Sequence, residues 1–167
     1  MLRKKLSLDE ATRSKDLSGK TYIVTGANSG IGLETTRQLV TQGGHVVLAC
    51  RRTDAAEEAT RSFSGLKGSH EVMRLDLADL QSVRDFVAEF SSDHDRLDGL
   101  ACNAGLVSMG KDPEYTKDGL EKTIGVSYFG HFLLTELLLD TLRASHPHAW
   151  RSSHRWCTPA APRTGRR

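Results

Sequence analysis

A glycine-rich turn at residues 25–32, Thr-Gly-Ala-Asn-Ser-Gly-Ile-Gly, constrains the fold more than any other feature of the sequence. It follows a β-branched and aromatic segment at 20–25 and precedes a segment at 31–42 whose apolar residues have helical spacing. Glycines allow such a backbone to turn tightly and to approach a pyrophosphate, while the helix N-terminus offers N–H groups to the anion. The motif therefore predicts a dinucleotide-binding unit, with an ordinary strand–helix turn as the alternative.

Strands and helices are expected to alternate along the chain. The expected strands cover 20–25, 45–50, 72–75 and 97–102, and the expected helices cover 31–42, 54–63, 79–90 and 118–143. This order is typical of right-handed βαβ crossovers. It predicts an α/β fold of the Rossmann type, the N-terminal portion of a doubly wound parallel sheet with about four strands. A fifth strand should follow the long helix, but residues 146–167 contain no segment of that kind.

The end of the second predicted strand indicates which dinucleotide is bound. Cys50 is followed by Arg51 and Arg52, and the first acidic residue, Asp54, lies four residues beyond the strand. Sites for NAD usually carry an acidic residue here for the ribose 2′-hydroxyl, whereas an arginine suits the 2′-phosphate of NADP. We therefore expect NADP (NADPH) as the cofactor. The alternative is a solvated arginine pair at the end of a strand.

Four motifs together resemble one family. They are Thr-Gly-Ala-Asn-Ser-Gly-Ile-Gly (25–32), Leu-Asp-Leu (75–77), Cys-Asn-Ala-Gly (102–105) and Gly-His-Phe-Leu-Leu (130–134). Through them, residues 17–145 resemble the short-chain dehydrogenases/reductases, and Leu-Ala-Cys-Arg (48–51) and Asp-Gly-Leu-Glu-Lys (118–122) resemble the retinol dehydrogenase and light-dependent protochlorophyllide reductase branch. The resemblance implies an NADP-dependent oxidoreductase. It would transfer hydride between the nicotinamide and a carbonyl, an alcohol or a conjugated double bond of a small, apolar substrate.

The resemblance also implies roles for individual residues. The pyrophosphate would lie against Gly26, Ser29, Gly30, Ile31 and Gly32, the 2′-phosphate against Arg51 and the adenine against Asp76, while Asn103, Ala104 and Gly105 would line the cofactor cleft. For Asn103 the alternative is a turn residue after a strand. His131 is interpreted as a packed helix residue rather than a catalyst. No metal site is expected.

Two departures from the family concern catalysis. Ser127 occupies the position, four residues before His131, where the family usually has an asparagine that holds a water for proton relay. Ser127 is therefore the one candidate catalytic residue. The family's tyrosine and the lysine four residues after it are absent, because Gly26, Gly119 and Phe132 stand four residues after the three tyrosines. We therefore expect that these 167 residues do not catalyse hydride transfer. The alternative is a non-catalytic NADP-binding module.

Composition predicts three parts in the chain. These are an N-terminal extension (1–16), an incomplete NADP-binding Rossmann domain (17–145) and a disordered basic tail (146–167). The tail carries a net charge of +5 and holds both tryptophans, while the first 145 residues carry −3. Codons that the genetic code permits for residues 148–157 can be chosen so that, read in a shifted frame, they encode a segment that resembles the family's fifth strand. We therefore expect a C-terminal truncation by frameshift, with a genuine terminus or a splice product as alternatives.

Other classes of protein are disfavoured. The three cysteines are too few and too scattered for a disulfide scaffold or a zinc site, and neither a secretory signal nor a membrane span is visible, so a cytoplasmic location is expected. Five tail arginines give little support for nucleic-acid binding. The predicted helix 118–143 should expose apolar side chains that favour aggregation, or homo-oligomers in a longer form. These are Phe129, Phe132, Leu133, Leu137 and Leu138.

Overall fold

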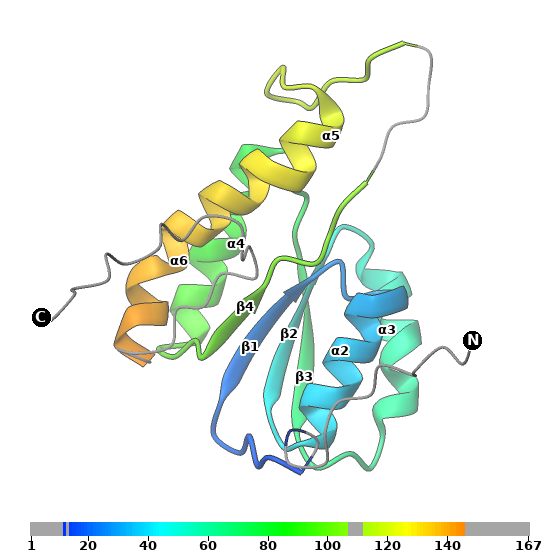
Figure 1. Ribbon diagram of the computed structural model, residues 1–167, viewed down its shortest axis with the longest axis vertical. Helices are drawn as coiled ribbons and strands as arrows, with labels where there is room; N and C mark the ends of the chain where they lie inside the picture. Colours follow the sequence, from blue (N-terminus) through cyan, green and yellow to red (C-terminus); the bar gives the residue numbers. More distant parts are fainter. Residues whose placement is uncertain (1–11, 13, 107–111, 146–167) are drawn as a thin grey trace, which may run out of the picture.

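Four parallel strands form the centre of the structure, a computed structural model that describes residues 12, 14–106 and 112–145. The strands are β1 (Thr21–Thr25), β2 (His45–Cys50), β3 (Ser69–Arg74) and β4 (Gly99–Ala101). Their order in the sheet is β3-β2-β1-β4 (Figure 1). The chain runs outward from β1 to β3 and then crosses back to β4 on the other side of β1. This reversal of strand order confirms the predicted Rossmann-type sheet.

Helices cover both faces of this sheet (Figure 1). They are α2 (Gly30–Thr41), α3 (Thr53–Thr60), α4 (Leu80–Asp93), α5 (Lys122–Ile124) and α6 (His131–Ser145), with a 3-10 turn η1 (Arg61–Phe63) and a π-helical turn η2 (Gly125–Gly130). Helices α2 and α3 pack on one face, and α4 and α6 on the other. No helix among the described residues is sufficiently long and apolar to pass through a membrane.

The alternation of side chains along each strand divides the core into two layers. In β2, Val46 and Leu48 point toward α2 and α3, whereas Val47 and Ala49 point toward α4 and α6. All four side chains are buried, as expected for a parallel strand with helices on both faces. The near-continuous apolar run of residues 45–50 is therefore explained by burial on both sides of the sheet.

The boundaries of β3 and β4 differ from the prediction. β3 begins at Ser69 rather than at residue 72, because the polar residues Ser69, His70 and Glu71 pair with β2 through their backbones. β4 covers three residues, Gly99–Ala101, rather than 97–102. Hydrophobicity marks neither boundary, because backbone hydrogen bonding does not depend on the side chain.

The predicted single helix over 118–143 is wrong. Residues 118–121 form a turn, and the carboxylate of Glu121 then accepts the N–H groups of Thr123 and Ile124 at the start of α5. The helix widens into η2 before α6 begins. A β-carbon on Gly130 would lie 2.7 Å from the carbonyl oxygen of Leu77, so this part of the chain passes too close to the loop after β3 for a larger residue. Tertiary contact therefore shapes this segment.

The exposure of apolar residues on η2 and α6 was predicted only in part. Phe129 and Phe132 are exposed, at 40% and 55%, and Leu137 is exposed at 39%. Leu133 is half-buried, and Leu138 is fully buried, contrary to prediction. Leu138 lies on the side of α6 that packs against α4 and the sheet. The exposed apolar surface is therefore smaller than expected.

Part of the predicted N-terminal extension contacts the domain. The carbonyl oxygen of Thr12 accepts a hydrogen bond from Nε2 of Gln42 at 2.6 Å. The carboxylate of Asp16 pairs with Nζ of Lys67 at 2.9 Å. The predicted basic tail and its proposed frameshift lie outside the described residues.

Leu138→Ala is expected to lower the free energy of unfolding by about 2–5 kcal/mol, because it removes a fully buried side chain and leaves a cavity. The matched control, Leu137→Ala on the same helix, should cost less than about 1 kcal/mol. Urea denaturation followed by circular dichroism measures both values. A larger loss for Leu137→Ala than for Leu138→Ala would contradict the orientation of α6.

Candidate functional site

The glycine turn lies at the carboxyl edge of the sheet, between β1 and α2. Gly26 and Gly30 have φ angles of +66° and +56°, in the left-handed region that favours glycine. A β-carbon on Gly26 would lie 3.0 Å from the Cα of Ala104, and one on Gly32 would lie 2.5 Å from the carbonyl oxygen of Gly26. Glycine is therefore required both for the turn itself and for its close approach to the segment after β4.

A buried hydroxyl group joins the turn to that segment. The Oγ1 of Thr25 accepts the backbone N–H groups of Asn103 at 2.9 Å and Ala104 at 3.0 Å, and it lies 2.9 Å from Nε2 of His131. Two N–H donors occupy both lone pairs of the hydroxyl, so its own proton is left for an acceptor. Nε2 of His131 is nearer than the other available acceptor, the carbonyl oxygen of Ala101 at 3.3 Å.

This assignment fixes the protonation of His131. If Nε2 accepts, Nδ1 carries the proton and donates to the carbonyl oxygen of Ser127 at 3.3 Å. The ring is buried, and burial lowers the pKa of His131, which favours the neutral form. Its location agrees with the prediction of a packed helix histidine. Sequence reasoning missed Thr25, since its partners lie 78 or more residues away along the chain.

The side chain of Asn103 also braces the glycine turn. Its Nδ2 donates to the carbonyl oxygen of Thr25 at 3.0 Å and lies 3.5 Å from that of Gly26. A β-carbon on Gly32 would collide with the same Nδ2 at 2.5 Å. Asn103 therefore links the end of β1 with the segment after β4.

A cleft opens at this edge of the sheet. Six of the predicted residues line it: Gly26, Ser29, Arg51, Asp76, Ala104 and Gly105. Ten further residues, to which the sequence analysis assigned no role of their own, complete its walls: Asn28, Ala49, Cys50, Arg52, Leu75, Leu77, Ala78, Leu106, Lys122 and Val126. The first turn of α2, with Gly30, Ile31 and Gly32, follows Ser29 directly, although these three do not line the cleft. Residues at the end of β2 and just after β1, β3 and β4 thus meet in one place.

Charged groups of both signs lie around this cleft. Arg51 and Arg52 are exposed at the end of β2, and Lys122 reaches it from α5 while pairing with Glu114. Asp76 is held in place by its own turn, because its Oδ1 accepts the N–H of Ala78 at 3.0 Å. The cleft could therefore accept an anionic ligand near Arg51 and a hydrogen-bond donor near Asp76.

Ser127 lies outside the lining of the cleft. It is exposed in η2, and its Oγ lies 3.7 Å from the position that a β-carbon on Gly105 would occupy. Ser127 therefore lies beside Gly105, which lines the cleft, and does not contribute to the lining itself. Its hydroxyl is accessible for hydrogen bonding.

The fold and the cleft are those of a dinucleotide-binding α/β protein. The model of the short chain dehydrogenase family matches residues 20–148. The chain belongs to this family. The match starts one residue before β1 and includes the glycine turn, Asp76, the segment after β4 and His131.

Curated relatives are 40–46% identical to this chain over the residues that align. It is 46% identical to retinol dehydrogenase 13 of Homo sapiens over 134 residues. This alignment covers 78% of this chain and 40% of the relative. It is 45% identical over 126 residues to the chloroplastic protochlorophyllide reductase of Chlamydomonas reinhardtii, which covers 74% and 32%. The chain thus spans less than half the length of these relatives.

A solved structure has the same fold. A metagenomic short-chain oxidoreductase in complex with NADP superposes with a TM-score of 0.68 and 28% identity, over 77% of this chain and 58% of the other. The likeness extends over most of the residues described above. It includes the predicted order of strands and helices.

Thr25→Val is expected to lower the free energy of unfolding by about 1–3 kcal/mol, because valine deprives two partly buried N–H groups of their acceptor. Thr25→Ser keeps the hydroxyl and should cost less than about 1 kcal/mol. Urea denaturation of the two variants measures the difference. Equal losses would show that the Thr25 hydroxyl does not stabilise the turn.

Proposed function

We propose that this chain binds NADP in the cleft at the carboxyl edge of its sheet, as the cofactor-binding part of a short-chain oxidoreductase. The observation that carries the proposal is the convergence of Gly26, Arg51, Asp76 and Ala104 on one cleft. A related structure of 28% identity was solved in complex with NADP, which supports the choice of cofactor. When bound, NADPH would supply the hydride for reduction.

The start of α2 suits the pyrophosphate. The N-terminal residue of α2 is Gly30, and the preceding Ser29 is exposed and makes no side-chain capping hydrogen bond. In contrast, Asp79 caps α4 by accepting the N–H groups of Gln81 and Ser82. The first N–H groups of α2 are therefore not occupied by such a cap and can bind an anion, helped by the helix dipole. Gly26 and Gly32 hold the turn close to the segment after β4, and the space beside Gly30 is open.

Arg51 and Arg52 would distinguish NADP from NAD. A guanidinium group binds a phosphate through two parallel charge-assisted hydrogen bonds. Both arginines lie at the end of β2, where the family fold places the adenosine ribose. Asp76 would lie against the adenine, and Asn103, Ala104 and Gly105 would close the side of the cleft nearest β4.

We propose further that these 167 residues do not catalyse hydride transfer. No tyrosine is followed by lysine at the fourth position, so the family's proton donor is absent from this sequence. Ser127 is the single residue at a catalytic position of the family. Two proposals fit a sequence without this tyrosine–lysine pair: the chain is part of a longer enzyme, or it is a non-catalytic NADP-binding module. A longer form would act on a small, apolar substrate and could associate with a second copy through the exposed aromatic residues of η2 and α6.

Arg51→Ala is expected to weaken NADPH binding by about 10–150-fold, corresponding to about 1.5–3 kcal/mol, and to leave NADH binding nearly unchanged. The matched control is Arg61→Ala, because Arg61 is an exposed arginine in η1 that does not line the cleft. Isothermal titration calorimetry with each nucleotide measures the affinities. Equal losses for NADPH and NADH would contradict the role of Arg51.

The chain is expected to oxidise NADPH no faster than buffer alone with retinoid, steroid or small ketone substrates, because a general acid worth about 10²–10⁴-fold is absent. The loss of NADPH absorbance over time measures the rate. Gly32→Val serves as control, since its side chain should block the turn without removing any polar group. Turnover that disappears in Gly32→Val would contradict the proposed inactivity.

A further inference from the structure

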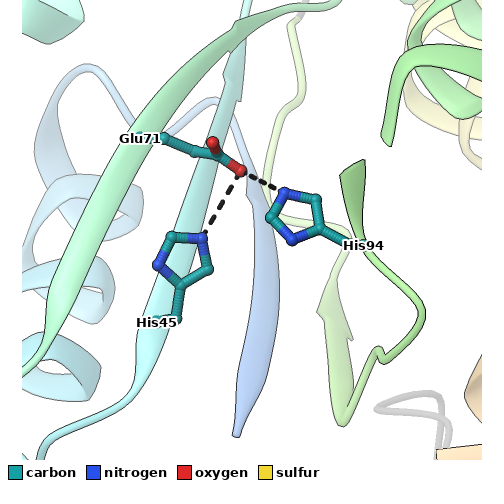
Figure 2. A group of neighbouring side chains, drawn as sticks. All are labelled: His45, Glu71 and His94. Carbon is teal, nitrogen blue, oxygen red and sulfur yellow. Dashed lines mark hydrogen bonds and ion pairs between the residues drawn. The ribbon is translucent and has the colours of Figure 1, made fainter. Parts of the chain in front are cut away.

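Two histidines and a glutamate meet at the edge of the sheet opposite the cleft (Figure 2). His45 is the first residue of β2, whereas the last residue of β2, Cys50, lines the cleft. In the parallel register, His45 pairs with Ser69 and Val47 pairs with Glu71, so His45 and Glu71 lie on the same face of the sheet. His94 reaches this face from the C-terminal cap of α4.

The three side chains direct their ligand atoms toward one another. The Oε1 of Glu71 lies 3.4 Å from Nε2 of His45 and 2.6 Å from Nε2 of His94. All three ligand atoms lie within 4.8 Å of one another. In a tetrahedral zinc site, bond lengths of about 2.0–2.2 Å separate neighbouring ligand atoms by about 3.3 Å. The His45–Glu71 distance matches this value, whereas the His94–Glu71 distance is shorter and would lengthen by about 0.7 Å when both atoms bind the ion.

Neighbouring residues orient both imidazole rings. Nδ1 of His45 lies 2.7 Å from Oγ of Ser69, a partner that can accept the Nδ1 proton and leave Nε2 as the free lone pair. The ring of His94 stacks on the buried ring of Phe90, with centroids 4.7 Å apart. Figure 2 shows both rings facing the carboxylate between them. Contacts of this kind hold the ligands of metal sites in position.

The accessibility of the cluster suits an ion that enters from solvent. The side chains of His45, Glu71 and His94 are 28%, 36% and 18% exposed. The cluster is thus partly shielded from water but open at one side, where water or a fourth ligand can complete the coordination. Two imidazoles and one carboxylate are the ligand set of several open zinc sites.

We propose that His45, Glu71 and His94 bind a divalent transition-metal ion of the zinc type. The ion would join the paired strands β2 and β3 to the end of α4. It would lie at the opposite edge of the sheet from the proposed NADP cleft, so it would stabilise the fold rather than take part in hydride transfer. Metal affinity for the folded state adds directly to the free energy of unfolding.

The test is a zinc titration of the full 167-residue chain after removal of bound metal with a chelator. Residues 146–167 contain three histidines and a cysteine that can also bind zinc. The test therefore compares the number of zinc ions bound by the unchanged chain with the number bound by each variant. Calorimetry should find one equivalent of Zn²⁺ fewer in Glu71→Gln and in His94→Ala than in the unchanged chain. The matched control is His70→Ala, because His70 precedes Glu71 on β3 but packs against Phe63 on the other face of the sheet. It should keep the full number of equivalents.

Cobalt(II) absorption gives a second measurement that depends on the ligands. A tetrahedral site of nitrogen and oxygen ligands gives visible d–d bands without thiolate charge transfer, and the intensity of these bands should be lower in Glu71→Gln than in the unchanged chain. If His94→Ala fails to fold, the nearly isosteric Glu71→Gln decides the result. Equal uptake by the unchanged chain and Glu71→Gln would overturn the proposal and leave the cluster as a hydrogen-bonded trio. So would a loss in His70→Ala equal to that in Glu71→Gln.

Discussion

The close approach of the glycine turn to the segment after β4 is the constraint on which the rest of the structure depends. The Thr25 hydroxyl accepts the N–H groups of Asn103 and Ala104, and no β-carbon at Gly26 could enter the remaining space without touching Ala104. His131 completes the arrangement from α6. One buried hydroxyl thus connects β1, β4 and the last described helix, in a region where an unsatisfied polar group would be costly.

This arrangement determines where a ligand can bind. The strand order reverses where β1 pairs with β4, and the cleft lies at this edge of the sheet, between the glycine turn, Arg51 and Asp76. The opposite edge of the sheet carries different chemistry. There, His45 and Glu71 from neighbouring strands meet His94, and none of the three lines the cleft. The two edges can therefore be tested by separate substitutions.

The sequence predicted those features that depend on local pattern. The strands β1 and β2 and the helices α2 and α4 were expected within a few residues, because buried parallel strands and amphipathic helices leave strong signals. The start of β3 was missed, since the polar residues Ser69 and His70 pair with β2 through their backbones. The break at η2 was missed because contact with Leu77 requires Gly130. Thr25 as a junction and the His45–Glu71–His94 cluster depend on residues far apart in the chain, so no spacing motif indicated either.

The central claim is that the cleft at the carboxyl edge binds NADP. Titration of NADP⁺ into the ¹⁵N-labelled chain, followed through its backbone amide resonances, tests this claim most directly. We expect the largest shifts at residues 26–32, at Arg51 and Arg52, and at residues 103–106, with little change at His45, Glu71 and His94. Shifts confined to other residues, or none at saturating NADP⁺, would contradict the account.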